Sequence, residues 1–402
     1  MSCDNEYSTI GEFGQVIMGL SPKGDTYNEN GEGLPLLNGP TEFGSSHPLP
    51  TLYTTDSKRE SKKGDLIFCV RGSTTGRMNW SDQKYSLGRG VCAIRGKSDI
   101  DTKYLRYALE VGLDSLLNVA GGGTFPNLKK DDIKTFRIPV LRNKDELVRI
   151  ISAYDDLIQN NLKRIALLEQ AGQNIYEEWF VNMRFPGHDK IAVDKETGLP
   201  KGWKQKELGE IISKIESGSR PKGGIDKSLK LGVPSIGAES IRGLGYFDFT
   251  KTKYVKRDFF LQMNKGHLKH KDILIYKDGA YIGRSTLFQD NFPFKECSIN
   301  EHVFLVHASN EQLQYYLYFT LHSKVYFEKM QNLNSNAAQP GINQSKIKTL
   351  TIRIPTEELF VQFDKLVSPF VEQIYVLAKE NLRLQQARDI LLPRLMNQTI
   401  KV

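Results

Sequence analysis

The feature that most constrains this chain is an apolar stripe in which side chains recur at alternating intervals of four and three residues. The stripe runs from Leu147 to Trp179, inside the stretch from Arg142 to Met183, and Asn161 and Gly172 interrupt it. This heptad spacing predicts one long amphipathic helix that carries a coiled-coil seam. At 1.5 Å per residue, the helix rises roughly 48 Å between Leu147 and Trp179.

A second stripe with the same order of intervals begins at Phe363 and ends at Leu395. Two such helices can pack against each other, and an antiparallel pair would bury both stripes within one chain. The alternative is that each helix packs on its own globular domain. Ser368 and Pro369 have the pattern of an N-cap followed by proline at the first helical position, which predicts that the straight part of the second helix begins there.

The two halves of the chain match each other in order, which indicates a tandem duplication. The spacing between matched positions drifts in the globular parts and stays fixed along the helices. Loops have therefore absorbed insertions while the helices kept their length. The matched segments are Gly19 with Gly218, Leu34-Pro35 with Val233-Pro234, residues 65–72 with 272–279, residues 76–77 with 283–284, and Arg137-Ile-Pro139 with Arg353-Ile-Pro355.

These patterns predict an α+β chain with an internal pseudo-two-fold repeat. Two mixed α/β domains are separated by two long helices that pack as an antiparallel coiled coil. The predicted boundaries are residues 1–141 for the first domain, 142–183 for the first helix, 184–203 for a polar connector, 204–355 for the second domain and 356–402 for the final helix.

Composition narrows the class of protein further. A net charge of +8 favours a polyanionic partner such as nucleic acid, although many basic proteins are merely soluble. No apolar run approaches the length that a membrane span needs, and the N-terminus lacks a signal-peptide pattern, so a cytoplasmic protein is expected. Four cysteines have neither metal-site nor disulfide spacing and are expected to be reduced and mostly buried: Cys3, Cys69, Cys92 and Cys297.

The sequence offers no convincing active site. Asp56, Glu60 and Lys62 have the residue types of a metal-dependent nuclease, but they lie close together in one charged loop, where solvated side chains are the simpler interpretation. Asn291-Phe-Pro-Phe294 is similar to the motif with which amino-methyltransferases hold a flipped base, but Phe292 replaces the first proline, so a turn between strands is expected. We therefore predict no catalytic residues, no metal site and no cofactor site in this chain.

Polar loops follow the matched strands in both halves, and these are the best candidates for contacts with DNA. Arginine, asparagine, serine and threonine are the side chains that read base edges, whereas lysines suit phosphates. For any single side chain, an ordinary solvated hairpin is an equally good interpretation. The candidate DNA-contacting residues are Arg71, Ser73, Thr74, Thr75, Arg77, Asn79, Arg89, Lys129, Lys130, Lys222, Lys253, Lys256, Lys277, Tyr281, Arg284, Gln339, Asn343 and Lys346.

At this point the whole chain resembles the specificity subunits of type I restriction-modification systems. The resemblance is carried by Trp203 before Leu208-Gly-Glu210, by the repeated aspartate-led strand with its glycine-arginine loop, by the Asn- and Gln-rich segments before Arg-Ile-Pro, and by the long helix after each domain. The first half departs from the pattern, because no tryptophan precedes Ile10-Gly-Glu12.

The resemblance implies two target-recognition domains that each read one half of a bipartite DNA site, with helices that fix the spacer between the halves. It also implies partners, namely double-stranded DNA, two methyltransferase subunits and restriction or translocase subunits, with no membrane. S-adenosylmethionine, ATP and Mg²⁺ would belong to those partners, and this chain would be non-catalytic. The alternatives are the recognition region of a fused restriction-methyltransferase, or a coiled-coil scaffold that binds protein.

Overall fold

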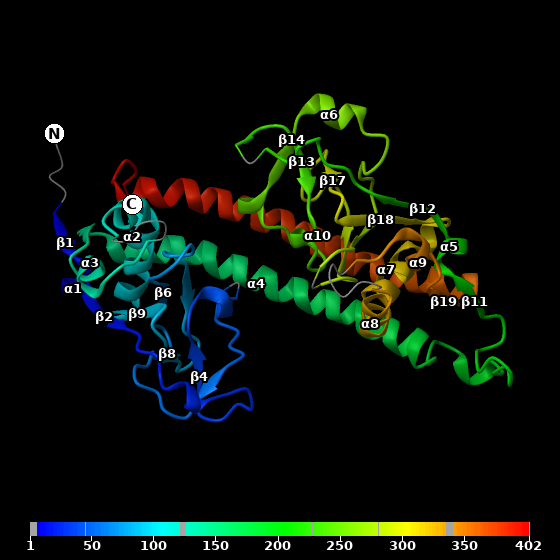
Figure 1. Cartoon of the computed structure of the whole chain (residues 1–402), viewed down its shortest axis with the longest axis horizontal. Helices are drawn as coiled ribbons and strands as arrows, with labels where there is room; N and C mark the ends of the chain where they lie inside the picture. The colour runs from blue at the N-terminus through cyan, green and yellow to red at the C-terminus, as the bar shows by residue number, and fades with distance from the viewer. Residues whose placement is uncertain are drawn as a thin grey trace. The chain divides into compact units, whose positions relative to one another are not determined.

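The computed structural model describes residues 6–401, except residue 45, residues 121–125, residue 227, residue 280 and residues 335–340. The chain forms two compact units. Unit 1 comprises Met1–Gln159 and Arg383–Val402, and unit 2 comprises Asn160–Leu382. Each unit combines a β-rich domain with part of the two long helices, α4 and α10 (Figure 1).

Unit 1 contains two small sheets and a separate strand pair. The larger sheet is antiparallel, with the order β2 (Gly14–Met18), β9 (Val91–Gly96), β6 (Leu66–Cys69) and β7 (Met78–Trp80). The smaller sheet has the order β3 (Tyr27–Asn28), β5 (Tyr53–Thr54), β4 (Leu34–Leu37) and β8 (Ser86–Leu87), and its β4–β8 pair is parallel. Strand β1 (Tyr7–Thr9) pairs with β10 (Arg137–Pro139).

The core of unit 1 lies on both faces of β6, which explains why this strand is apolar at every position. Leu66 and Phe68 belong to the cluster that includes helix α2 (Asp99–Asn118), whereas Ile67 packs with Leu37 and Leu87 of the smaller sheet. A strand covered on both faces loses the alternation of apolar and polar residues. Two short helices, α1 (Ile10–Phe13) and α3 (Lys130–Lys134), complete the domain.

Unit 2 repeats this arrangement. Its larger antiparallel sheet has the order β12 (Ile212–Ser217), β18 (Val303–Ala308), β15 (Asp272–Tyr276) and β16 (Ser285–Phe288). The smaller sheet is β14 (Lys253–Val255), β13 (Val233–Ile236) and β17 (Ser298–Ile299), with β13 and β17 parallel. Strand β11 (Lys204–Glu207) pairs with β19 (Thr351–Ile354), and the helices are α5 (Leu208–Ile211), α6 (Arg257–Gln262), α7 (Gln314–His322), α8 (Lys324–Asn332) and α9 (Gln344–Lys348).

The same strand order in both larger sheets confirms the tandem repeat, but the register of its last part differs from the predicted one. Ile138 pairs with Ser8, and Ile352 pairs with Lys206; each pairing lies one residue before the end of the strand that leads into α1 or α5. Ile138 is therefore equivalent to Ile352 and not to Ile354. The predicted match of Arg137-Ile-Pro139 with Arg353-Ile-Pro355 was therefore wrong by two residues. The same three residue types recur two positions further along the second strand, and the match followed residue type instead of strand pairing.

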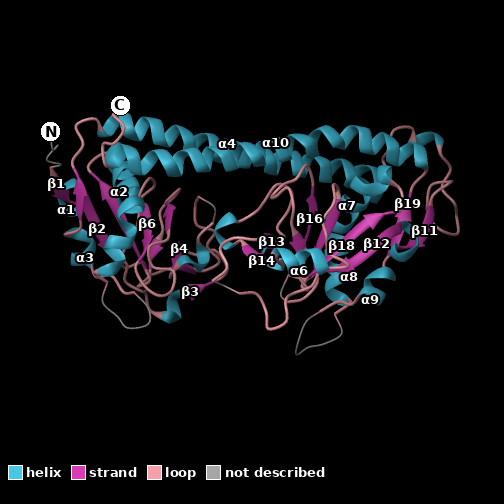
Figure 2. Ribbon diagram, turned by 90° about the horizontal axis from the view of Figure 1, so that it is seen from above, coloured by secondary structure: helices cyan, strands magenta, loops and turns pink. Residues whose placement is uncertain are grey.

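The long helices are α4 (Lys144–Tyr176) and α10 (Glu357–Met396), and α4 continues into a π-helical turn over Glu177–Val181. In unit 1, Asp155 of α4 forms an ion pair with Arg388 of α10 at 2.7 Å, and Ile151 shares a core with Leu392. In unit 2, the rings of Tyr176 and Phe363 lie 6.5 Å apart. In unit 2 the Asn161 amide of α4 also donates to Glu380 of α10 at 3.2 Å. Within each unit the residue numbers therefore run in opposite directions along the two helices, as an antiparallel pair requires, and in both views the stretches of α4 and α10 that belong to one unit lie side by side (Figures 1 and 2).

Helix α10 is uninterrupted, so the predicted start at Ser368 and Pro369 was wrong. A proline inside a helix removes the N–H group that would bond to the carbonyl four residues earlier, here that of Lys365. Both Lys365 and Pro369 are exposed, so water can hydrate that carbonyl. The Ser368 hydroxyl donates to the carbonyl of Asp364 at 2.6 Å instead of capping a new helix.

The polar stretch 184–203 is a folded part of unit 2. Phe185, Leu199 and Trp203 are all buried and belong to its main core. The rings of Phe185 and Trp203 stack at 5.6 Å, and Trp203 also contacts Phe180 at the end of the first long helix. These contacts explain why a tryptophan precedes the second domain.

Candidate nucleic-acid interface

The first candidate loop is a tight turn between β6 and β7, residues 70–77, which we call the first glycine turn. The N–H of Cys69 donates to the carbonyl of Arg77 at 2.8 Å, and that of Gly76 donates to Cys69 at 2.9 Å. Gly72 and Gly76 have φ values of 89° and 94°, which other residues adopt only with strain. A β-carbon at Gly76 would lie 2.7 Å from Leu113 of α2, so the turn packs closely on that helix.

The second glycine turn, residues 277–284 between β15 and β16, has the same main-chain hydrogen bonds. The N–H of Tyr276 donates to the carbonyl of Arg284 at 2.8 Å, and that of Gly283 donates to Tyr276 at 2.9 Å. A third bond, from Arg284 to Tyr281 at 3.1 Å, matches the bond from Arg77 to Thr74 at the same length. The two halves of the chain therefore present the same backbone frame, and each frame ends on an arginine.

Both arginines lie over an aromatic ring. The guanidinium carbon of Arg77 is 5.9 Å from the centre of the Phe43 ring, and that of Arg284 is 3.6 Å from the Tyr281 ring. No carboxylate among the described residues forms an ion pair with either guanidinium, although Arg77 also donates to the carbonyl of Pro40 at 3.4 Å. Contact with a ring orients each guanidinium and leaves N–H groups available for a ligand.

The remaining candidates of the first turn divide into exposed and structural side chains. Arg71 and Ser73 are exposed, and Thr74 is partly exposed. The Thr75 hydroxyl donates to the carbonyls of Gly72 at 2.8 Å and Pro126 at 3.1 Å, and so closes the turn. Asn79 is 5% exposed, and its amide donates to the carbonyl of Gly44 at 3.2 Å. Asn79 is therefore buried inside β7, where its side chain has a structural role and cannot reach a base edge.

In the second turn, Tyr281 is half exposed and supports Arg284. Lys277 instead bends back over the Phe304 ring at 5.3 Å and lies 3.7 Å from Asp278, so part of its charge is met within the protein.

The structure brings the Asn- and Gln-rich segments that precede Arg-Ile-Pro against these turns in both units. The N–H of Leu128 donates to the carbonyl of Val70, and that of Ile342 donates to Lys277, each at 3.0 Å. The exposed Lys129 and Lys130 therefore begin α3 beside the first turn. Asn343 begins α9 beside the second turn, where its side chain accepts from the N–H of Lys346 at 2.8 Å. Lys346 also reaches the carbonyl of Leu333 at 3.4 Å, and Gln339 lies outside the described residues.

The other lysine and arginine candidates lie apart or are already paired. Arg89 is exposed in the turn before β9, where its Nε is 3.4 Å from the Ser21 hydroxyl, and Lys222 is exposed in a turn before β13. Lys253 forms an ion pair with Glu239, and although burial opposes ionisation of Glu239, this pair holds the pKa of the carboxyl below its ordinary value.

The basic run around Tyr254 therefore carries less free charge than its sequence indicates. Lys251 pairs with Asp248 at 3.1 Å, and Arg257 pairs with Glu296. Lys256 is exposed at the start of α6, and no ion pair joins it to any described residue. Sequence reasoning also missed Arg242, an exposed arginine whose guanidinium lies 5.0 Å from the Tyr246 ring. An arginine and a tyrosine in the same loop are too common a pair for the sequence alone to mark them as a site.

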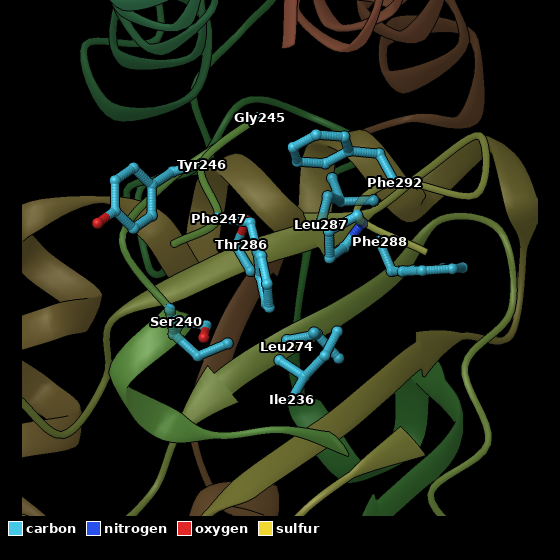
Figure 3. A pocket seen from close by; sticks show the side chains of 12 residues that line it. Ile236, Ser240, Gly245, Tyr246, Phe247, Leu274, Thr286, Leu287, Phe288 and Phe292 are labelled. Carbon is cyan, nitrogen blue, oxygen red and sulfur yellow. The ribbon is translucent and has the colours of Figure 1, made fainter. Parts of the chain in front are cut away.

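The remaining observations concern metal ligands, membrane spans, an apolar hollow and the cysteines. The described residues contain no group of three or more His, Cys, Asp or Glu that could hold a metal ion, and none of their helices is long and apolar enough to cross a membrane. An apolar hollow among Ile236, Leu274 and Leu287 measures about 20 Å³, room for about one water (Figure 3). Burial raises the pKa of the Cys92 and Cys297 thiols, and Cys69 is also buried; Cys3 lies outside the described residues.

Known proteins share this sequence pattern and this fold. The family model described as the type I restriction modification DNA specificity domain matches residues 3–170 and 200–381. The type I restriction enzyme MjaIX specificity subunit of Methanocaldococcus jannaschii is 27% identical over 372 residues, which cover 86% of this chain and 80% of that protein. The HindI specificity subunit of Haemophilus influenzae is 21% identical over 409 residues, which cover 85% of this chain and 87% of that protein.

A solved structure agrees with these matches at the level of the fold. The type I restriction-modification S subunit from M. genitalium covers 98% of this chain and 97% of its own, with a TM-score of 0.54 and 16% identity. The two family matches cover both repeats, and the fold is shared along the whole chain, which does not favour the protein-binding scaffold or the fused enzyme. The resemblance seen in the sequence is thereby confirmed: this chain belongs to the family of type I restriction-modification DNA specificity subunits.

Proposed function

We propose that this chain selects the DNA sequence for a type I restriction-modification complex, with each recognition domain reading one half of a bipartite target in double-stranded DNA. The observation that carries the proposal is the pair of glycine turns, which have the same three main-chain hydrogen bonds and end on Arg77 and Arg284. A bidentate arginine is the commonest specific contact to guanine in the major groove. Different side chains on one frame would read different half-sites.

The long helices would set the distance between the half-sites and dock two methyltransferase subunits. Helix α4 alone contains 33 residues, which rise roughly 50 Å at 1.5 Å per residue. Leu167 of α4 is 70% exposed and Val376 of α10 is 54% exposed, so each helix has an apolar side chain that a docked subunit could cover.

The chain itself would make sequence choices and perform no chemistry. Methyltransferase subunits would supply S-adenosylmethionine, and restriction or translocase subunits would use ATP and Mg²⁺.

The first test is co-expression of this chain with the methyltransferase gene adjacent to its own, followed by single-molecule sequencing of methylated adenines. A split motif with a fixed unread gap supports the proposal and gives the target. A stable complex that adds no methylation at any defined motif contradicts it. If no complex forms, the protein-binding scaffold becomes the better hypothesis.

The role of the helices has its own test. Removing one heptad from α4 together with the facing heptad of α10 shortens the pair by roughly 10 Å, or about three base pairs of B-DNA. We expect an unread gap that is about three base pairs shorter, or loss of assembly if docking fails. An intact complex that methylates sites with the original gap would rule out the spacer role.

A further inference from the structure

An open hollow of about 400 Å³ lies beside the second glycine turn in unit 2. Its walls come from three places in the chain: the loop at Arg242, the end of the turn at Arg284 and Ser285, and helices α7 and α8 at His322 and Phe327. The hollow is therefore built by the fold, and its rim carries two arginines and a histidine.

Each arginine of the rim is held by stacking on a tyrosine. Arg242 lies 5.0 Å from the centre of the Tyr246 ring, which points away from the neighbouring apolar hollow in Figure 3, and Arg284 lies 3.6 Å from that of Tyr281. No ion pair joins either guanidinium to a described residue, whereas Arg257 of the same unit pairs with Glu296. Two positioned guanidinium groups without a carboxylate form a site for an anion, and planar guanidinium groups match phosphate oxygens well.

The back of the hollow is fixed by a chain of polar contacts. The buried Ser285 hydroxyl and His322 Nδ1 lie within hydrogen-bond distance at 3.1 Å, and His322 stacks on Tyr318. Glu169 of α4 lies 3.7 Å from His322 Nε2, but its Oε1 already accepts from the N–H of Leu244 and the hydroxyl of Tyr318, each at 2.9 Å. These contacts hold Glu169 behind the wall, and it forms no ion pair with either arginine of the rim.

Unit 1 has a different charge at the equivalent place. Tyr104 and Tyr316 both donate to the carbonyl of an equivalent residue, Pro139 and Arg353, and so mark the same position in the repeat. Six residues later, unit 1 has Glu110 where unit 2 has His322. Burial raises the pKa of Glu110, while Arg106 and Arg388 lie 3.8 Å from its carboxylate. In unit 1 the position equivalent to His322 is therefore taken by Glu110, whose charge is met within the protein by Arg106 and Arg388.

We propose that the hollow of unit 2 binds a backbone phosphate of the target DNA through Arg242, beside the reading turn that ends on Arg284, and that unit 1 makes no such contact at its equivalent place. The inference rests on the proposed function, because it assumes that the second glycine turn faces DNA. It adds a positioning contact that holds the duplex against the reading turn and carries no sequence information of its own.

Arg242→Ala is the decisive variant, because Arg242 is exposed and belongs to none of the surfaces proposed to read bases. In the complex with its methyltransferase, we expect DNA affinity to fall about tenfold, the effect of one charge-assisted hydrogen bond. The slope of log K against log salt should become shallower by about 0.9, the value for one phosphate contact. Arg257→Ala, which removes an arginine already paired with Glu296, is the matched control and should change neither quantity.

The contact itself is located with DNA duplexes that carry one uncharged methylphosphonate linkage, placed in turn at each position of the target. At one position the wild-type complex should lose about the same affinity as the variant, and Arg242→Ala should lose nothing further there. If no position behaves in this way, the phosphate site is wrong. A changed methylation motif in Arg242→Ala would also overturn it, because the side chain would then read a base. Failure of the wild-type complex to bind DNA would instead contradict the proposed function.

Discussion

The two recognition domains share a buried aspartate but give it different partners. Asp65 and Asp272 are 2% and 1% exposed, and each accepts a hydrogen bond at 2.7 Å from the N–H three residues earlier. In the first domain, Arg95 of β9 binds Asp65 through two hydrogen bonds of 2.6 and 2.7 Å. In the second domain, His307 of β18 holds the same place, with its Nδ1 2.8 Å from Asp272.

The two partners differ in that Arg95 carries a permanent charge, whereas His307 can be titrated. The hydrogen bond with Asp65 raises the pKa of Arg95, which stays charged at any working pH. The hydrogen bond with Asp272 raises the pKa of His307, against the opposing effect of burial, and Glu311 acts in the same direction at 3.0 Å. Lys214 lies opposite His307 in β12 and pairs with Glu216. One fold thus tolerates two solutions to the same buried charge, and only the second depends on pH.

The largest effect is expected from Arg95→Ala, which breaks the permanent pair. Asp65 would remain buried without its partner, and we expect the first domain to lose about 3 kcal/mol of unfolding free energy. Hydrogen exchange of peptides covering β6 and β9 measures the loss, while peptides covering β15 and β18 serve as an internal reference. Arg89→Ala removes an exposed arginine of the same domain and should have little effect. Unchanged exchange in β6 would show that Asp65 does not need Arg95.

The next largest effect should be on recognition of DNA bases, and it is measured by comparing Arg77→Ala with Arg284→Ala. Each change should cost about 2 kcal/mol of binding to the target and relax one half of the motif, because a bidentate contact to guanine is lost. Methylation mapping with each variant complex shows which half is affected. Arg220→Ala, an exposed arginine paired with Glu301 at 3.2 Å, is the control. If both variants methylate the same sites with unchanged efficiency, the glycine turns do not read bases.

A smaller effect is expected from pH, and it should be confined to the second domain. The folded pKa of His307 lies above its unfolded value of about 6.5, so its stabilisation is fully present below about pH 6.5 and is lost as the pH rises through the folded pKa. We expect a loss on the order of 1.5 kcal/mol, typical of a hydrogen bond to a charged group. Hydrogen exchange of β15 and β18 peptides, followed from below about pH 6.5 to above the folded pKa of His307, measures this loss of stability. His307→Gln should remove the pH dependence, and a dependence that survives this change would assign it to another group.

The smallest effect should come from Lys253→Ala, whose charge is already met by Glu239. DNA affinity should change by less than about 0.5 kcal/mol, since exposed ion pairs contribute little. Lys256→Ala removes the exposed lysine three residues later and should weaken binding more. Equal losses in the two variants, measured by salt titration of DNA binding, would show that total charge rather than unpaired charge decides how this surface meets DNA.

Much of the architecture could be predicted from the sequence, because the signals were long or repeated. The heptad stripes predicted α4 and α10, and the repeated segments predicted two domains with equivalent strands. Short signals failed. The register error at Arg137-Ile-Pro139 arose because three letters cannot fix a register, and Ser368-Pro369 gave the local pattern of a helix start while packing kept α10 continuous.

The site was harder to predict, since the partner of a polar side chain comes from elsewhere in the fold. Nothing near Asn79 in the sequence announces that Gly44 will accept its amide, and Glu296 lies far along the chain from Arg257. Arg242 stayed unnoticed for the same reason, because its neighbours in the hollow come from β16, α7 and α8. Residue type indicates what a side chain can bind, whereas long-range packing decides whether it is free to do so.

The glycine turns have a consequence for how such a protein can change over generations. Their shape is held by main-chain hydrogen bonds, by glycines with positive φ and, in the first turn, by the Thr75 hydroxyl, so the exposed side chains contribute little to keeping it. Mutations at Ser73 or Tyr281 can therefore accumulate without unfolding the domain, and under the proposed function each new side chain would meet the same stretch of DNA. The backbone of the turns can therefore stay the same over generations while the DNA sequence that the protein would prefer changes.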